Sequence, residues 1–160
     1  MGFIRKWIKR YLCSMGFMNY DRPHVEGPKK RFHSMGTIGS NVYFNTNSGS
    51  IFVGKNVTWG HNVMVITGKH LFDGKSFFPY SKEGRDIIIS DGCWIASGAM
   101  INGGVKIGRC ALVCAGAVVT KDVPDGAVVA GIPAVVIRHV KIQENSNVQK
   151  ISVSVVKPGV

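Results

Sequence analysis

The sequence predicts an all-β protein built as a parallel β-helix, and residues 89 to 124 carry that prediction. This stretch reads as six consecutive hexads in one phase, each beginning with Ile or Val: Ile89, Ile95, Ile101, Ile107, Val113 and Val119. The fifth residue of every hexad is small or β-branched: Cys93, Ala99, Val105, Ala111, Ala117 and Val123. Neither the 3.6-residue period of a helix nor the two-residue period of an open sheet produces this spacing.

A triangular coil explains the repeat physically. A short strand followed by a tight corner, repeated three times, closes one coil, and each branched first residue points inward to stack on its equivalent one coil away. The second residues of the hexads are also short: Ser90, Ala96, Asn102, Gly108, Cys114 and Thr120. We therefore expect the second and fifth residues to fit inside a narrow prism.

The N-terminal repeats are less regular. They begin at Ile38 and slip out of phase between Phe44 and Val53, which predicts a turn that is either short by a few residues or bulged. The aromatic residues Phe44 and Trp59 occupy inward positions, and they suit a first coil wider than the later ones.

The stretch from residue 68 to residue 86 interrupts the repeat with Gly, Lys and aromatic residues. A loop of this length in a compact domain is usually functional or disordered. Phe77, Phe78 and Tyr80 argue against disorder, so we expect an arm that projects from one corner of the β-helix.

Residues 1 to 35 predict a basic amphipathic helix and a connector. In residues 2 to 18 the apolar and cationic positions interleave at helical spacing: Phe3, Ile4, Trp7, Ile8, Tyr11 and Leu12 with Arg5, Lys6, Lys9 and Arg10. Such a helix either lies on an anionic membrane surface or packs on the β-helix or a neighbouring subunit. The β-helix domain is expected over residues 36 to 138, followed by a tail over residues 139 to 160.

Charge and cysteine content narrow the function classes. The formal net charge of +11 indicates an acidic partner, and no RNA-binding or helix-turn-helix signature accompanies it, so nucleic acid is not expected. An anionic membrane or a phosphate-bearing ligand remains. The four cysteines form no CxxC pair and have no histidines at zinc spacing, which predicts no metal site, with reduced thiols acting as small hydrophobic residues. With no secretory signal or membrane-spanning run, we expect a cytoplasmic protein, or a peripheral one on the inner face of the membrane.

His70 is the sharpest catalytic candidate because it lies at the foot of the excursion. An imidazole on a loop that leaves a rigid scaffold can reach a neighbouring subunit and can remove a hydroxyl proton near neutral pH. A lone histidine is more often structural, so this argument alone does not decide. His61 is the rival, and its place in the third position of a repeat predicts an outward, solvated side chain.

The repeat run resembles the hexapeptide-repeat acyltransferases, whose domain is a left-handed β-helix that forms trimers. Thr67-Gly68-Lys69-His70 is similar, with one residue inserted, to the Thr-Gly-His element that holds the catalytic histidine in the sugar O-acetyltransferase branch. The resemblance implies a left-handed coil, a homotrimer, and His70 as the general base.

The same resemblance implies sites for acetyl-CoA as co-substrate. Trp94-Ile-Ala-Ser97 resembles the family's Trp-Ile-Gly-Ser, in which a backbone N–H near the Ser position meets the thioester oxygen. Residues 113 to 122 and 131 to 138 resemble two further family segments. They imply that Ala115 and Thr120 flank the pantetheine arm, that Lys121 meets phosphate, and that Arg138 lies near the nucleotide end. Taken alone, Lys121 and Arg138 would be read as solvated charges.

Asn45 and Trp94 are the candidate acceptor-binding residues. Asn45 and Asn47 match an asparagine that precedes an acidic turn in the sugar acetyltransferases, but residues 48 to 52 contain no carboxylate. The expected function is acetyl-CoA-dependent O-acetylation of a carbohydrate hydroxyl, in a surface polysaccharide or its precursor, which would be lipid-linked if residues 1 to 18 bind a membrane. The alternatives are N-acetylation of a nucleotide-linked amino sugar or a xenobiotic, and a non-catalytic scaffold or binding module. A zinc hydratase on this fold would need an H-x4-H element that the chain lacks.

Overall fold

The computed structural model describes residues 24–27, 32–33, 36, 38–78 and 85–142. Within these ranges every regular element is a β-strand, which confirms the all-β fold class. The helix expected over residues 2 to 18 and most of the C-terminal tail lie outside the described residues. The described residues also include no helix of the length and apolarity needed to span a bilayer.

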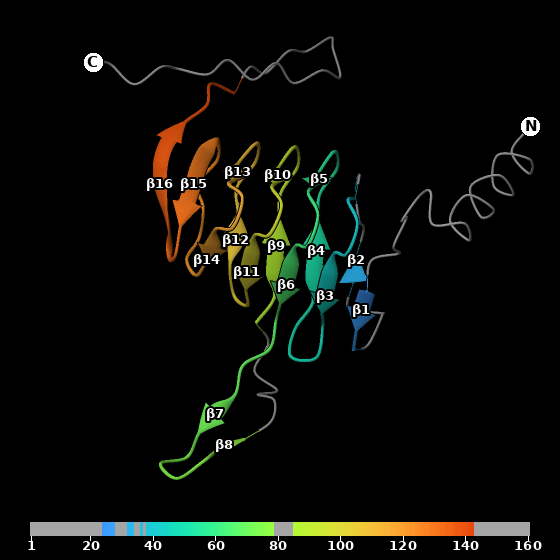
Figure 1. Cartoon of the computed structure of the whole chain (residues 1–160), viewed down its shortest axis with the longest axis vertical. Coiled ribbons are helices and arrows are strands. Elements are labelled where there is room, and N and C mark those ends of the chain that lie inside the picture. The colour runs from blue at the N-terminus through green and yellow to red at the C-terminus, as the bar shows by residue number, and fades with distance from the viewer. Residues whose placement is uncertain (1–23, 28–31, 34–35, 37, 79–84, 143–160) are drawn as a thin grey trace, which may run out of the picture.

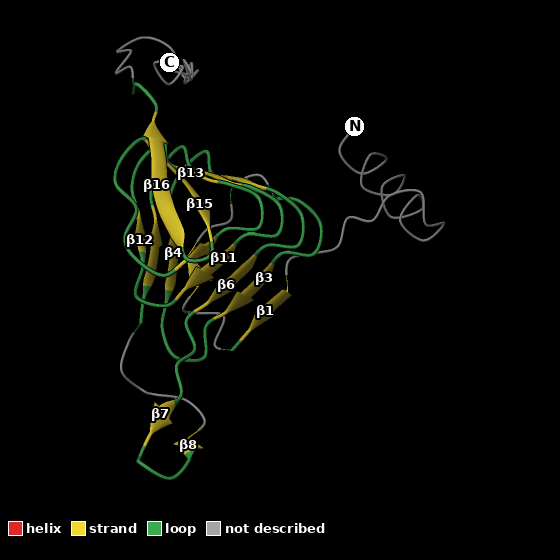
Figure 2. Ribbon diagram, turned by 60° about the vertical axis from the view of Figure 1, so that its left-hand side comes forward, coloured by secondary structure: helices red, strands yellow, loops and turns green. Residues whose placement is uncertain are grey.

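Three sheets form the faces of a prism (Figures 1 and 2). Sheet A contains, in stacking order, β1 (His24–Glu26), β3 (Tyr43–Asn45), β6 (Met64–Ile66), β11 (Met100–Asn102) and β14 (Val118–Val119). Sheet B contains β2 (Phe32–His33), β4 (Ile51–Val53), β9 (Ile87–Ile89) and β12 (Lys106–Ile107). Sheet C contains β5 (Thr58–Trp59), β10 (Trp94–Ile95), β13 (Leu112–Val113), β15 (Ala127–Gly131) and β16 (Ala134–His139).

The register between strands confirms that three hexads close one coil. Trp94 pairs with Leu112 in sheet C, and Met100 pairs with Val118 in sheet A, so equivalent residues on successive coils are three hexads apart. Pairing is parallel throughout the coil, and the antiparallel hairpin β15–β16 closes the prism. The left-handed sense of the coil stays a prediction from the resemblance.

The interior of the prism is built as the repeat predicts. All six first-position residues of the regular hexads are at most 1% exposed, and all six fifth-position residues are at most 4% exposed. Burying a branched side chain of this size contributes about 1.5–3 kcal/mol, so this central stack is the main source of stability.

The second-position residues are not inside the prism, which corrects the prediction for them. Ser90, Ala96, Asn102 and Cys114 are half-buried and Thr120 is exposed, because these positions lie at the corners. They are short for another reason, which Gly108 illustrates. A Cβ added to this buried glycine would lie 2.4 Å from the backbone nitrogen of Asp125, so the next coil leaves no room for it.

The first coils begin earlier and are longer than the regular ones. β1 pairs with β3 and β2 pairs with β4, so the sheets already include segments of the stretch expected to be a connector. Tyr43 pairs with Met64, so this coil exceeds three hexads, and the excess lies between β3 and β4. The slip is therefore a bulged corner. Phe44 and Trp59 are buried inside this coil, with ring centroids 5.2 Å apart in an edge-to-face arrangement.

The excursion forms an arm that carries a β-hairpin, whereas the sequence analysis predicts no strand there. β7 (Leu71–Phe72) pairs antiparallel with β8 (Phe77–Phe78), and the hairpin projects away from the stack of coils (Figure 1). Asp73 closes the turn, because its carboxylate accepts hydrogen bonds from the N–H groups of Lys75 and Ser76, both at 2.8 Å. Gly74 supplies the positive φ of +99° that the turn requires.

Candidate functional site

Six of the candidate residues divide between two corners of the prism. We call corner AB the edge where the chain passes from sheet A to sheet B, and corner CA the edge where it passes from sheet C to sheet A. Asn45 ends β3, the arm with His70 leaves after β6, and Thr120 and Lys121 follow β14, so all four lie at corner AB. Two further cofactor candidates, Ser97 and Ala115, follow β10 and β13 and lie at corner CA.

Thr67 fixes the outgoing end of the arm. Its side chain is fully buried, and both its N–H and its hydroxyl donate to the carbonyl oxygen of Asn45, at 3.1 and 2.9 Å. Its hydroxyl oxygen accepts the N–H groups of Ser48 and Gly49, at 3.3 and 3.2 Å. The bulged corner after β3 therefore wraps around the residue from which the arm departs.

Arg85 fixes the returning end of the arm, and the sequence analysis did not identify it. Its guanidinium Nη2 donates to the carbonyl oxygen of Gly103 at 2.5 Å, and its own carbonyl accepts the N–H of Gly104 at 3.1 Å. A Cβ on Gly103 would lie 2.9 Å from the carbonyl oxygen of Thr67 and 3.0 Å from the Cβ of Arg85. Gly103 and Gly104 thus let both ends of the arm pack on the next coil. This pair of glycines is the feature of the sequence that could have pointed to the position of Arg85.

His70 lies between Thr67, where the arm leaves the coil, and the β7–β8 hairpin. It is exposed, a short step beyond the buried Thr67 and directly before β7. The anchored ends of the arm thus fix where the chain that bears the exposed His70 leaves corner AB.

A polar cluster lies beside the root of the arm and includes Glu26, which the sequence analysis also missed. The phenol of Tyr43 donates to Glu26 Oε2, and the amide of Asn45 approaches the same oxygen at 3.4 Å. The amide of Asn47 approaches Glu26 Oε1 at 3.4 Å, and its N–H donates to Asn45 Oδ1 at 3.1 Å. Glu26 thus brings a carboxylate next to the amides of Asn45 and Asn47. The pairing of Glu26 with Asn45 concealed it, because that offset is longer than the three hexads of the regular coil.

Ser97 and Ala115 are brought together at corner CA. The N–H of Gly116 donates to the carbonyl oxygen of Ser97 at 3.0 Å, which stacks the two turns. Within the described part of the chain, the N–H of Ser97 donates to no acceptor. A Cβ on Gly60 would lie 2.3 Å from that nitrogen, so only glycine lets the preceding coil pack this closely on the Ser97 turn.

His61 lies at the same corner with its ring on the outer surface, as expected, and it also takes part in the hydrogen bonds of that corner. The ring is exposed, yet its Nδ1 accepts the N–H of Ser40 at 3.0 Å. Its own N–H donates to the hydroxyl of Ser97 at 3.1 Å. His61 thus links three successive turns of corner CA.

Trp94 and Arg138 lie on sheet C, away from Asn45. Pairing places Trp94, Leu112, Val128 and Arg138 in one row across four strands. At the usual strand spacing the two ends of this row are about 14 Å apart. Trp94 is 52% exposed on the outer face of sheet C, so within one chain it is not part of the polar cluster at corner AB.

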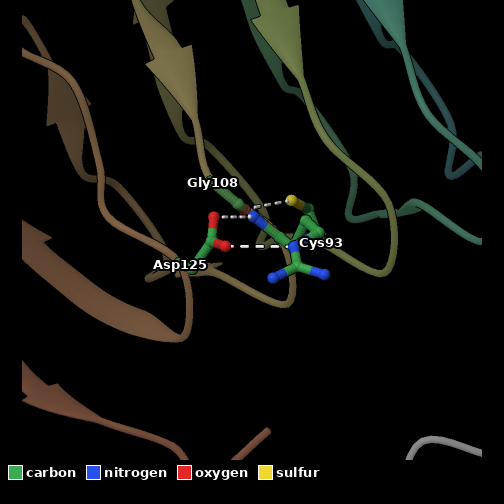
Figure 3. A network of polar contacts seen from close by, with 4 residues as sticks. Cys93, Gly108 and Asp125 are labelled. Carbon is green, nitrogen blue, oxygen red and sulfur yellow. Dashed lines mark hydrogen bonds and ion pairs between the residues drawn. The ribbon is translucent and has the colours of Figure 1, made fainter. Parts of the chain in front are cut away.

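The third corner, between sheets B and C, is structural (Figure 3). The Cys93 thiol donates to the carbonyl oxygen of Gly108 at 3.0 Å, and burial raises its pKa to about 12, so it stays protonated as a small hydrophobic residue. Asp125 accepts the backbone N–H of Arg109 at 2.7 Å and its guanidinium Nε at 3.0 Å, and these bonds lower the pKa of the carboxyl. The described residues contain no cluster of three or more His, Cys, Asp or Glu side chains suited to a metal ion.

Comparisons with known proteins place this geometry among the acyltransferases. Residues 86–121 match the family model described as bacterial transferase hexapeptide (six repeats). The chain is 32% identical over 108 residues to the galactoside O-acetyltransferase of Lactococcus lactis, covering 64% of this chain and 52% of the relative. The first curated relatives are covered over about half of their length, from 44% to 58%.

Two solved structures share both fold and sequence with the chain. The maltose O-acetyltransferase of Clostridium difficile superposes with a TM-score of 0.56 and 30% identity, over 75% of this chain and 67% of that one. A galactoside acetyltransferase in complex with coenzyme A superposes with a TM-score of 0.58 and 30% identity, over 74% of this chain and 60% of that one.

Proposed function

The chain belongs to the hexapeptide-repeat transferase family, and from that premise we propose that it transfers an acetyl group from acetyl-CoA to a carbohydrate hydroxyl. The observation that carries the proposal is the junction at corner AB, where Thr67 ties the arm bearing His70 to the backbone of Asn45. The sugar acetyltransferases among the similar proteins support this acceptor class. We further propose that the acceptor belongs to a surface polysaccharide or its precursor. The basic composition of residues 1 to 35 supports this source.

The residues present at the two corners fit acetyl-CoA as co-substrate. At corner CA, the Ser97 N–H has no acceptor among the described residues, Ala115 is small and exposed, and a Cβ on Gly116 would meet nothing within 4 Å. An extended thioester arm can lie against such a surface. At corner AB the exposed Lys121 is placed to neutralise phosphate.

In the proposed mechanism His70 removes the proton of the acceptor hydroxyl as its oxygen attacks the thioester carbonyl carbon. The Ser97 N–H stabilises the charge that develops on the thioester oxygen. The carbon–sulfur bond then breaks, the acetyl group stays on the sugar oxygen, and the His70 imidazolium returns its proton to the thiolate. Orientation of the two substrates supplies about 7–11 kcal/mol of the rate enhancement. The base contributes about a hundredfold or more.

Two copies of the chain are needed to complete this site. Ser97 and Ala115 precede the strands of sheet A, whereas His70 and Lys121 follow them, so the two groups lie at opposite edges of one face. The arm also exposes Leu71, Phe72 and Phe77, at 40%, 59% and 71%, and an isolated two-stranded hairpin is marginally stable in water. A homotrimer in which each arm packs on its neighbour brings the corners together and covers these side chains.

Replacing His70 with Ala tests the mechanism. We expect kcat to fall about 100- to 10,000-fold, while acetyl-CoA affinity and assembly are retained, because the imidazole acts on the proton in transit. Thiol release from acetyl-CoA, measured with methyl glycosides and with amine acceptors, gives the rate. The amine arm of the panel also separates N-acetylation from O-acetylation.

Lys75→Ala is the matched control, since it changes the same arm at its exposed turn. Turnover by His70→Ala equal to that of this control would end the proposal. Absence of thiol release with every acceptor in the unaltered protein would favour a non-catalytic scaffold.

A further inference from the structure

Both ends of the arm meet at one glycine of the coil that follows it. The chain leaves the stack after β6 and rejoins it before β9, and the arm projects between these two points (Figure 1). A Cβ on Gly103 would lie 2.9 Å from the carbonyl oxygen of Thr67 and 3.0 Å from the Cβ of Arg85. The arm is therefore closed at its base by Thr67, Arg85 and Gly103, which we call the neck.

The two ends of the arm are bonded to different coils. Thr67 bonds to the preceding coil, because its N–H and its hydroxyl donate to the carbonyl oxygen of Asn45. Arg85 bonds to the following coil: its Nη2 donates to the carbonyl oxygen of Gly103 at 2.5 Å. The carbonyl oxygen of Arg85 also accepts the N–H of Gly104 at 3.1 Å. Arg85 thus ties the arm to the following coil through its side chain and its backbone together.

The following coil adjoins a cofactor candidate at corner AB. β11 pairs with β14, with Ile101 opposite Val119. Gly103 and Lys121 follow these two residues at the same distance along the chain, so they occupy equivalent places on successive coils. Neighbouring strands lie about 4.8 Å apart. The point where Arg85 bonds to the coil is therefore one strand spacing from the residue proposed to neutralise phosphate.

The guanidinium of Arg85 lies across Gly104. A Cβ on this glycine would lie 3.5 Å from Nε, 3.6 Å from Nη2 and 4.0 Å from Cζ, so the planar group covers it. In the preceding coil, a Cβ on Gly49 would lie 2.8 Å from the carbonyl carbon of Arg85, so the bulged corner is packed against the same residue. A guanidinium can cover one residue and donate to its neighbour at once, whereas an ammonium is a point charge without a plane. Arg85 is therefore packed between the coils on both sides of the arm.

We propose that Arg85 is a positioning residue for acetyl transfer: by bonding the returning end of the arm to Gly103 and Gly104, it closes the neck and sets where His70 meets the thioester. The inference rests on the proposed function and adds to it a residue that touches neither substrate. Its physical basis is that an arm with a loose end samples more positions, and a displacement of about 1 Å at a reacting group can cost about a hundredfold in rate.

The test is Arg85→Ala in the full chain, with steady-state kinetics measured by thiol release. We expect kcat to fall about 10- to 100-fold, while KM for acetyl-CoA and for the acceptor stays unchanged, because the side chain contacts neither. Guanidinium chloride at millimolar concentration, far below the molar range that unfolds proteins, should restore part of the lost kcat by occupying the place of the missing group.

Arg109→Ala is the matched control. The Nε of Arg109 also bonds to an adjacent coil, through the carboxylate of Asp125 at 3.0 Å, but it does so at the corner between sheets B and C. Neither this substitution nor added guanidinium should alter kcat in the control.

The amide of Gly104 reports closure of the neck without turnover, because its N–H donates to the backbone carbonyl of residue 85. Its hydrogen exchange should be faster in Arg85→Ala and should slow again when guanidinium is added. The amide of Met100, in β11 of the same coil, donates to the carbonyl oxygen of Ala117 at 2.8 Å. Its exchange rate should be the same in both proteins.

These measurements separate the inference from the proposed function. Faster exchange at Gly104 that guanidinium reverses, with no thiol release by the unaltered protein, would sustain the role of Arg85 in closing the neck and refute acetyl transfer. A normal kcat in Arg85→Ala, or a raised KM for acetyl-CoA at unchanged kcat, would overturn the positioning role while acetyl transfer stands. Faster exchange at Met100 as well, with no response to guanidinium, would show that Arg85 only stabilises the fold, which overturns it too.

Discussion

The coils after the arm and the coils before it share the same prism but differ in regularity and in where their polar side chains lie. From β9 to β14 the paired strands are three hexads apart, and only the closing coil is shorter, with Leu112 paired to Val128. Corner carboxylates of these coils bind the backbone of an adjacent coil, as Asp125 does with Arg109. Before the arm the pairing offsets are longer, and the polar side chains gather outside one corner, where Glu26, Tyr43 and Asn45 meet. The regular coils are the scaffold, and the departures from regularity are where the chain has built its candidate site.

Within one strand of the scaffold, inward and outward residues should differ most in their contribution to stability. Ile87 and Ile88 are neighbours in β9, but Ile87 is fully buried and Ile88 is 42% exposed. We expect Ile87→Ala to lower the free energy of unfolding by about 2–5 kcal/mol, since the removed methyl groups leave a cavity in the central stack.

Ile88→Ala is the matched control, with an expected loss below about 1 kcal/mol, because much of its side chain stays in water. Urea denaturation followed by circular dichroism measures both. Similar losses of unfolding free energy for the two variants would show that the inward residues are not the main source of the coil's stability.

The regular coils could be predicted from the sequence because a single six-residue period determines both which residues face inward and where the corners lie. A residue such as Ile101 must face inward if its equivalents at every sixth position do, and the structure confirms it. Glu26 and the β1 strand could not be found this way, since the chain around them has no apolar phase and pairs at a different offset. Arg85 was missed for a related reason: its partner is a backbone carbonyl, which side-chain patterns do not reveal.

Substitution of Thr67 tests whether the irregular coil positions the arm that carries His70. Thr67→Val keeps the shape of the side chain and removes the hydroxyl that bonds to the Asn45 carbonyl and accepts two N–H groups. Leaving these buried groups short of a partner should cost about 1–3 kcal/mol of stability. Because the arm departs from this residue, kcat should fall more than acetyl-CoA affinity does.

Thr58→Val makes the same chemical change at an exposed position on sheet C, where the expected stability change is within about 0.5 kcal/mol. Steady-state kinetics and thermal unfolding of the two variants give the comparison. A Thr67→Val protein with normal kcat and normal stability would show that the arm's root is not held through this hydroxyl.

The smallest expected effect is a pH dependence confined to the arm. The N–H groups of Ser76 and Lys75 hold the pKa of Asp73 below its usual range, so its ionised form favours the closed turn. A carboxyl with a lowered folded pKa contributes stability above its unfolded value, near 3.9, and that contribution is lost as pH falls through the folded pKa. The amide proton resonance of Ser76 should therefore move toward its random-coil position on acidification below about pH 4, and Asp73→Asn should abolish that titration.

Asp125 gives the contrasting case within the scaffold. Its pKa is also lowered, but its turn lies between paired strands of the regular coils. The amide of Arg109 should therefore report the titration of Asp125 without opening of the coil. If the Ser76 resonance does not titrate with Asp73, the hairpin turn is held by its backbone and the arm is as rigid as the coils beside it.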